Sequence, residues 1–326
     1  GMPGLSSGRT FFSMAGRRMP PFDPAGYATP DWQCVMILWG DKYGIETVNR
    51  LVSAVAAHAR RQPRFVLLTD RARPGLDARV TARPIPEVWL QPGMLGGGCQ
   101  AKLCLFDPGV VPDDLPAVYL DLDTVILGDV GTATGLLKPG GLLMLQSAIL
   151  PFGPLGRLVC RLTGGKRYAR GNSSVVIYHP ADCGYIAARF LDLKRQYPTL
   201  GFPPMCADER FISWAAQAVV AAVPTSFAVK LPTEYMSRIA VLGYVWAVLP
   251  WVRARRRRLV VVTLCGMTVK PEALLALPEN GRLTDRHGRT LIWSDAVLGH
   301  VRRAILAFCA PARPDRSPPD RWQSDN

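Results

Sequence analysis

The sequence predicts an α/β fold in a single domain, with helices flanking a Rossmann-like mixed sheet. Three observations predict it. Two uninterrupted apolar runs are separated by a segment with helical spacing, as in a strand–helix–strand unit. A third apolar run leads directly into a pair of aspartates. Finally, the chain has 326 residues, of which 48% are hydrophobic, which is enough for a sizeable core.

The first strand–helix–strand unit is the clearest part of the pattern. Residues Cys34–Trp39 are all apolar, which is typical of a strand buried on both faces in a parallel sheet. A helix is expected from Ile45 to about Arg61, because one face carries Val48, Leu51, Val52 and Val55. Phe65–Leu68 is the next strand, and it ends at Thr69 and Asp70. Loops at the carboxyl ends of such strands are where α/β proteins bind ligands.

The later elements follow from shorter patterns. A helix around Ala101–Phe106 follows three glycines, and the strand Ala117–Leu120 comes next. Further elements are expected as strands Leu142–Leu145, Ser174–Tyr178 and Leu259–Thr263 and as a helix over Ala207–Val219. Residues 1–30 are expected to form a loosely packed or disordered tail, and residues 311–326, rich in Pro, Asp and Arg, a disordered one. The domain is therefore expected to span residues 31–310.

The charge and the cysteines narrow the class of protein. The net charge is +14, from 39 Lys and Arg against 25 Asp and Glu, which favours anionic partners. No nucleic-acid-binding motif is recognisable, so we expect no nucleic-acid partner. The eight cysteines are scattered, without CxxC pairs or zinc-finger spacing. Buried, reduced thiols fit this pattern and predict a cytoplasmic location.

Residues 236–258 form an apolar and then basic segment. Its run Ile239–Val252 is shorter than the roughly 20 residues that cross a bilayer. An arginine block, Arg253 to Arg258, follows it. Two interpretations remain open: an interfacial segment on an anionic membrane, which would place the protein peripherally at the inner membrane face, or a buried helix with a solvated basic end.

The Asp121-Leu122-Asp123 motif carries the chemistry. Residues two apart on a strand point the same way, so both carboxylates are expected to project where the apolar strand ends. Two close carboxylates repel one another, and a hard cation such as Mn²⁺ or Mg²⁺ relieves the repulsion. The alternative is two solvated aspartates at a strand end, but placement directly after a buried strand favours the metal site.

The segment Val118–Asp129 resembles the D-x-D region of GT-A glycosyltransferases, and most resembles bacterial relatives of glycosyltransferase family 8. Other segments match the family in the same order: Trp39–Tyr43, Leu68–Asp70, Gln100–Lys102, Gly171–Ile177 and Asp208–Ile212. The resemblance spans roughly residues 34–275. It implies a GT-A fold and transfer of a sugar from a nucleotide-diphosphate sugar, most simply a UDP-sugar, to a saccharide or lipid-linked acceptor. It also implies a divalent metal held by the D-x-D aspartates.

The resemblance implies donor-binding roles near the start of the sheet. Tyr43 would contact the nucleoside, Asp41 and Asp70 would bind its polar edges, and Lys102 would reach a donor phosphate or sugar hydroxyl. Each has a structural alternative. Tyr43 could be an ordinary packed side chain, Asp70 a turn cap and Lys102 a solvated helix residue.

The resemblance places the sugar pocket later in the chain. Asn172 and Ser173 would line it, and Asp208 would accept hydrogen bonds from sugar hydroxyls. Glu209 would lie beneath the anomeric carbon of a retaining enzyme, whereas in an inverting one Asp208 or Glu209 would serve as general base. The alternatives are a Gly-Asn turn and a helix N-terminus stabilised by carboxylates.

One position departs from the family pattern. The family carries a His-Gly pair followed by Lys-Pro, and its histidine completes the metal site. Here Cys265 precedes Gly266, with Lys270 before a proline. Cys265 stands at the position of the third metal ligand, where a thiolate suits Mg²⁺ poorly. Weaker metal binding, a different third ligand and a degenerate site all remain open. Gly266 and Lys270 would still contact the diphosphate.

Two other functions compete with sugar transfer. A haloacid-dehalogenase-type phosphohydrolase would use Asp121 as nucleophile in an Asp-x-Asp-x-Thr/Val motif, but that motif normally opens its domain. A catalytically degenerate GT-A binding module is the other alternative, and Cys265 in place of histidine favours it.

Overall fold

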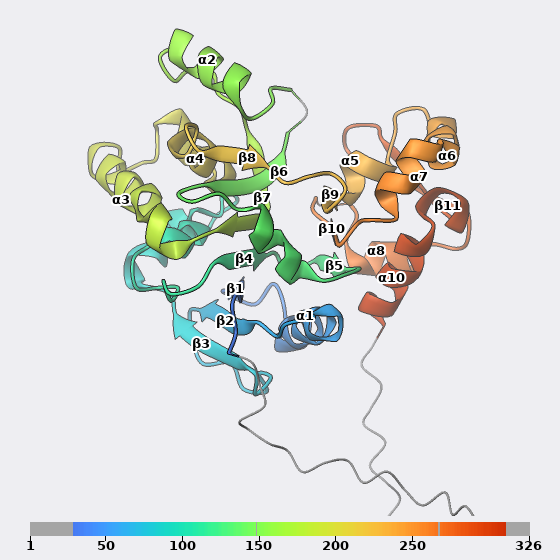
Figure 1. Ribbon diagram of the computed structural model, residues 1–326, viewed down its shortest axis with the longest axis horizontal. Helices are drawn as coiled ribbons and strands as arrows, with labels where there is room; N and C mark the ends of the chain where they lie inside the picture. The colour runs from blue at the N-terminus through green and yellow to red at the C-terminus, as the bar shows by residue number, and fades with distance from the viewer. Residues whose placement is uncertain (1–28, 148, 267, 311–326) are drawn as a thin grey trace, which may run out of the picture.

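The computed structural model describes residues 29–147, 149–266 and 268–310 (Figure 1). The tail predicted for residues 1–30 lies outside the described residues except for its last two, and the tail predicted for 311–326 lies outside them entirely.

A mixed sheet of seven strands forms the centre of the molecule (Figure 1). Its strand order is β3-β2-β1-β4-β7-β6-β8, with these bounds: β1 Gln33–Leu38, β2 Arg64–Thr69, β3 Val80–Pro84, β4 Ala117–Leu120, β6 Leu142–Gln146, β7 Gly171–Tyr178 and β8 Val220–Ala222. The strands β3, β2, β1 and β4 are parallel, and β7 runs antiparallel to both of its neighbours. The predicted α/β class with a mixed sheet is therefore confirmed.

Both faces of the sheet are buried, which explains the uninterrupted apolar runs. Along β1, Cys34, Met36 and Leu38 face the core that includes α1 (Ile45–His58), whose apolar stripe is the predicted one. Val35 and Ile37 face the opposite core. That second core contains α3 (Pro180–Gln196), α4 (Asp208–Ala215) and the 3-10 helix Gln100–Phe106.

The C-terminal third adds a smaller layer beside the main sheet. A three-stranded sheet, β5-β10-β9, joins β5 (Thr124–Ile126) to the later strands β9 (Ala228–Lys230) and β10 (Val261–Thr263). Because β5 directly follows the Asp121–Asp123 motif, this sheet brings C-terminal loops to the motif. The remaining α-helices and strands are α2 (Pro154–Leu162), α5 (Leu231–Tyr235), α6 (Val241–Val248), α7 (Pro250–Arg256), α8 (Pro271–Leu275), the hairpin β11 (Gly281–Thr284)–β12 (Thr290–Trp293), α9 (Asp295–Leu298) and α10 (His300–Cys309).

Several predicted elements differ from the observed ones. The helix around Ala101–Phe106 is a 3-10 helix. The helix predicted over 207–219 ends at Ala215, and the strand predicted over 259–263 begins only at Val261. The apolar run 239–252 forms two helices, because the residue before Pro250 is held in an extended conformation that ends α6.

Candidate active site

The aspartate motif lies in a turn rather than on a strand. β4 ends at Leu120, and the chain turns through Asp121 and Asp123 into β5. Backbone bonds fix the turn on both sides: the Asp121 N–H donates to the Ser174 carbonyl (2.9 Å), and the Asp123 carbonyl accepts from Leu264 N–H (2.9 Å). The two carboxylates are close enough for the charge of Asp121 to raise the pKa of Asp123. The predicted proximity therefore arises from a turn instead of the pleat of a strand.

Asp121 is bound by two buried side chains. The Lys102 ammonium donates to its Oδ1 at 2.9 Å, and the Tyr119 hydroxyl donates to the same oxygen at 2.5 Å. Burial acts to raise the pKa of Asp121, but the Lys102 charge and these hydrogen bonds outweigh it and hold the pKa below its usual value. Asp121 is therefore an anion at neutral pH.

Lys102 connects the aspartate motif to α4. Its ammonium also lies 3.2 Å from the Ser173 hydroxyl and 3.6 Å from the Asp208 carboxylate, and its side chain is only 10% exposed. Burial acts to lower its pKa, but Asp121, Tyr119 and Asp208 together raise it well above the ordinary value. This ammonium balances two buried carboxylates that would be costly to bury unpaired.

Asp208 and Glu209 open the first turn of α4 and face the start of β7. The Ser173 hydroxyl donates to Asp208 at 2.6 Å, and the Asn172 amide donates to Glu209 at 2.8 Å. Burial raises the pKa of both carboxyls, and the charge of Asp208 raises that of Glu209 further. Beyond the one amide donor, the Glu209 carboxylate has no other side-chain partner among the described residues.

Asp123 faces the C-terminal layer. Its carboxylate pairs with Lys270 and accepts a 3.4 Å hydrogen bond from the Tyr43 hydroxyl. Burial, followed by the charge of Asp121, raises the pKa of Asp123. Burial and the Asp123 charge raise the pKa of Tyr43 to about 12, so the phenol stays protonated and remains a donor.

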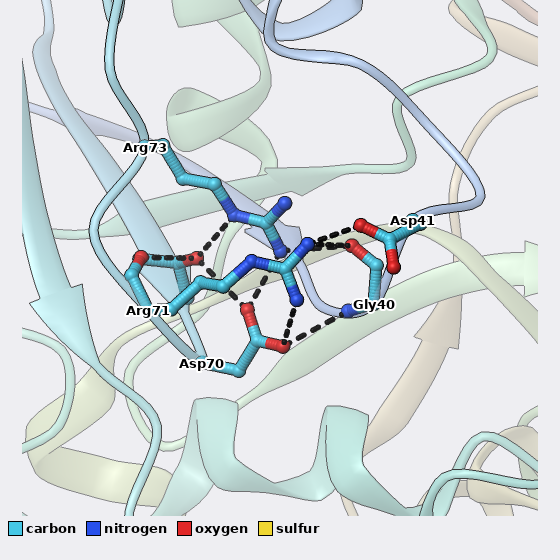
Figure 2. Close-up of polar contacts among 6 residues, drawn as sticks. Gly40, Asp41, Asp70, Arg71 and Arg73 are labelled. Carbon is cyan, nitrogen blue, oxygen red and sulfur yellow. Dashed lines mark hydrogen bonds and ion pairs between the residues drawn. The ribbon is translucent and has the colours of Figure 1, made fainter.

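Asp41 and Asp70 belong to a separate polar network at the ends of β1 and β2, drawn in Figure 2. Asp70 accepts from the Gly40 N–H (3.0 Å) and from Arg73 (2.6 Å), and Arg73 also donates to the Gly40 carbonyl (3.0 Å). Arg71 pairs with Asp41. Gly40 has φ +62°, a conformation that favours glycine. The hydrogen bonds from Gly40 to Asp70 and from Arg73 to Gly40 fix the loop that precedes Tyr43.

A cavity of about 390 Å³ opens beside these groups. The sequence analysis had named four of its lining residues: Asn172, Cys265, Gly266 and Lys270. Lys42 and Thr268 also line it and lie close to named residues in the sequence. The sequence analysis missed the others that carry charge or can do so, namely Lys230, Asp285, Arg286, His287 and Arg289. Four of those five come from the turn of the β11–β12 hairpin, and no local pattern links that turn to the aspartates.

The two aspartates fit a divalent cation. Lys270 places an ammonium on Asp123, which is the position where a cation would balance the two neighbouring carboxylates. Mg²⁺ is commonly bound through one or two carboxylates together with water and substrate phosphates, so a cage made wholly of protein is unnecessary.

Cys265 does not complete a three-residue site. Within the part of the chain that the structure describes, no three His, Cys, Asp or Glu side chains gather closely enough to bind a metal ion. Burial raises the pKa of the Cys265 thiol, so it is neutral at physiological pH. A thiol binds a metal only after it loses its proton, and Mn²⁺ and Mg²⁺ are hard cations that favour oxygen ligands, so Cys265 as the third ligand remains a prediction.

Solved structures resemble the chain over most of its length. An active-site mutant of LgtC matches with a TM-score of 0.51 and 14% identity, covering 85% of this chain and 94% of the other. The galactosyltransferase LgtC in complex with donor and acceptor sugar analogues matches at 0.50 and 15% identity, covering 85% and 95%. The chain has the GT-A fold.

The bifunctional glycosyltransferase WbbM in its apo form matches this GT-A fold with a TM-score of 0.51 and 12% identity, covering 90% of this chain and 51% of WbbM. No family model matches the sequence, and no curated protein matches it significantly. At these low identities the likeness establishes the GT-A fold, and the activity has to be argued from the site.

Proposed function

We propose that the chain is a glycosyltransferase that moves a sugar from a nucleotide-diphosphate sugar, most simply a UDP-sugar, to a saccharide or lipid-linked acceptor. The observation that carries the proposal is the Lys102 ammonium. It joins the aspartate motif, through Asp121, to the Asp208–Glu209 pair of α4 in one buried network. Metal-site carboxylates and candidate catalytic carboxylates therefore stand together beside a cationic cavity, on a fold that LgtC and WbbM share.

The donor is bound in two parts. Tyr43 contacts the nucleoside. Asp41 and Asp70 hold the loop before Tyr43 in shape through the contacts drawn in Figure 2. The diphosphate occupies the cationic cavity, where Lys270 lies next to Gly266. Gly266 has φ +108°, and a Cβ atom at this position would meet only a proline ring, at 3.9 Å, so its backbone is open to a phosphate.

Asp121 and Asp123 would hold Mn²⁺ or Mg²⁺ through their carboxylates. Charge that develops on the departing diphosphate would be neutralised by such a cation when it is bound. Lys270 would then leave Asp123 and donate to a phosphate oxygen instead, because the same ammonium cannot fully serve both anions.

Asp208 and Glu209 have different tasks. Asp208 is engaged by Lys102 and by Ser173, so we assign it to positioning and to binding sugar hydroxyls. Glu209 has the freer carboxylate, and Asn172 orients it. In a retaining reaction Glu209 faces the anomeric carbon, and in an inverting reaction it takes the proton of the acceptor hydroxyl.

The alternative of a haloacid-dehalogenase-type phosphohydrolase is not favoured. The matching structures are glycosyltransferases, and Asp121 follows the fourth strand along the chain rather than the first. All eight cysteines are free, which supports a reducing compartment such as the cytoplasm.

Turnover of UDP-sugars tests the proposal. With Mn²⁺ present, we expect hydrolysis or transfer that releases UDP, and we expect Asp123→Asn to abolish it. Nucleotide binding without any turnover would instead indicate a binding module. Phosphatase turnover that needs no nucleotide would favour the phosphohydrolase.

A further inference from the structure

Large apolar side chains are exposed mainly on two segments outside the candidate active site. The first segment contains α2 and the second α6 and α7. Of the sixteen large exposed apolar side chains in the part of the chain that the structure describes, eleven belong to them: Ile149, Leu155, Leu158 and Leu162 in the first, and Ile239, Val241, Tyr244, Val245, Trp246, Val248 and Trp251 in the second. Apolar surface concentrated in this way marks an interaction site rather than scattered surface residues.

α2 is a short amphipathic helix with its apolar face outward. Only Gly156 is buried, and a Cβ there would lie 2.6 Å from the Pro151 carbonyl, so glycine allows the helix to sit close to the chain before it. Leu158 and Leu162 are 52% and 77% exposed, and the arginine Arg161 between them is exposed as well. The sequence analysis did not single out this segment.

α6 is apolar over its whole length, yet it is not part of the core. It lies entirely within the described residues, and none of its eight residues is buried. Trp246 is 49% exposed, and Trp251, at the start of α7, is 66% exposed. Of the two interpretations that the sequence left open for this segment, the buried helix is therefore wrong.

A second cavity, of about 480 Å³, lies beneath α6 and α7. Two arginines of α7, Arg253 and Arg256, line it together with Arg257 directly after the helix, and Asp295 and His300 line the opposite side. Arg256 is committed to Glu234 at 2.7 Å, and Asp295 faces Arg302 at 3.4 Å. Arg253 and Arg257 are exposed, and neither has an ion-pair partner among the residues that the structure describes. The cavity thus offers two uncommitted guanidinium groups directly beside an exposed apolar helix.

We propose that α2 and α6–α7 together form a docking surface for an anionic lipid bilayer, with Arg253 and Arg257 binding lipid phosphates. Both α2 and α6 lie along the upper edge of the molecule in Figure 1. Tryptophan beside arginine is the composition of helices that lie in a membrane interface. Within the described residues, no helix is long and apolar enough to cross a membrane.

Charge decides between a bilayer and a second copy of the chain. The net charge is +14, and arginines border both apolar segments. Pairing two copies through this surface would bring like charges together, whereas anionic lipid supplies the opposite charge. The docking surface does not depend on the proposed reaction. If that reaction is correct, α5 links the donor cavity to α6, so the acceptor would be taken from the membrane surface.

Vesicle flotation with the full chain tests the surface. We expect the protein to float with phosphatidylcholine vesicles that contain phosphatidylglycerol and not with phosphatidylcholine alone. Trp246→Glu/Trp251→Glu and Leu158→Glu/Leu162→Glu should each abolish flotation. Arg253→Gln/Arg257→Gln should weaken binding roughly thirtyfold, because each basic side chain near an anionic surface contributes about a factor of five.

Matched variants separate the surface from general charge effects. Leu136→Glu/Leu275→Glu alters two large exposed apolar side chains outside both segments, and Arg60→Gln/Lys138→Gln removes the same charge from other exposed sites. Both should float as the unaltered protein does. The proposal would be overturned if every variant floated with the vesicles to the same extent, or if flotation were the same with and without phosphatidylglycerol. A dimer in sedimentation that the tryptophan variant dissociates would also overturn it. Melting curves with UDP show independently whether each variant is folded and whether the donor site is intact.

Discussion

At the scale of single residues, Glu209 is the side chain whose environment best matches a reacting group. It stands at the N-terminus of a helix, it is held by one amide, and burial raises its pKa above that of a free glutamate. A carboxylate that is partly desolvated is a better nucleophile or base than a solvated one, and active sites tune carboxyl groups in this way.

The raised pKa gives a prediction in which activity and stability change in opposite directions. The folded chain binds a proton at Glu209 more readily than the unfolded chain does, so stability falls as pH rises through the interval between the two pKa values. The ionised side chain therefore destabilises the fold at neutral pH. Glu209→Gln keeps an oxygen to accept the Asn172 hydrogen bond and removes the charge. We expect a higher melting temperature at pH 7 and a kcat lowered by about a hundredfold or more.

The same shift sets the pH profile of the unaltered enzyme. Because the ionised form is the active one, kcat should fall as pH drops through a value above the ordinary glutamate pKa. The control is Glu87→Gln, which removes an exposed carboxylate distant in sequence from Glu209 and should change neither the pH profile nor the melting temperature. A Glu209→Gln variant that melts lower and retains full turnover would show that the side chain is structural.

At the scale of elements, the β11–β12 hairpin is what completes the donor cavity. Its turn contributes Arg286 and Arg289 to a cavity whose lysines come from the loop after β1, from β9 and from the loop before α8. Arg289 is fixed by Asp285 at 2.7 Å, whereas Arg286 is exposed and, among the described residues, its side chain contacts only the neighbouring His287. Arg286 is therefore the freer of the two to meet a phosphate.

Removing that guanidinium should weaken donor binding without unfolding the chain. A charge-assisted hydrogen bond contributes roughly 1.5–3 kcal/mol, so Arg286→Ala should raise the Kd for UDP about tenfold or more. Arg282→Ala is the matched control, since Arg282 is exposed on the same hairpin and does not line the cavity. Titration calorimetry measures both. Equal affinities for the two variants would remove the hairpin from the donor site.

The sequence predicted elements well where burial imposes a pattern and poorly elsewhere. β1, β2 and β4 were predicted because strands covered on both faces are continuously apolar. The strands β5, β8 and β9 have only three residues each, which is too short for any periodicity to show. The outward face of α2 was missed because a leucine stripe looks the same whether it faces a core or solvent.

The sequence predicted which residues form the candidate site, but it did not predict the contacts between them. Asp121, Asp123, Asp208 and Glu209 were all named from their motifs. The sequence could not show that Lys102 bridges the two pairs or that Asp41 and Asp70 pair with arginines, because those contacts depend on tertiary structure. The roles assigned to these residues remain predictions.

At the scale of the whole molecule, the fold brings distant segments to one edge of the sheet. Loops after β1, β2 and β4 meet there, as expected at the carboxyl ends of parallel strands. The antiparallel strand β7 adds Asn172 and Ser173 from its first residues, because its start lies next to the end of β4. The β5-β10-β9 sheet then closes the opposite side with the Cys265–Lys270 loop.

The most direct test of this account is a thermal-shift measurement with nucleoside diphosphates, in the presence and absence of Mn²⁺. A ligand that binds only the folded chain raises its melting temperature by mass action. We predict that UDP raises the melting temperature, that Mn²⁺ increases the shift, and that Asp123→Ala loses the increase due to Mn²⁺. If no nucleoside diphosphate shifts the melting temperature, with or without Mn²⁺, the assignment of this cleft to a nucleotide-sugar donor is contradicted.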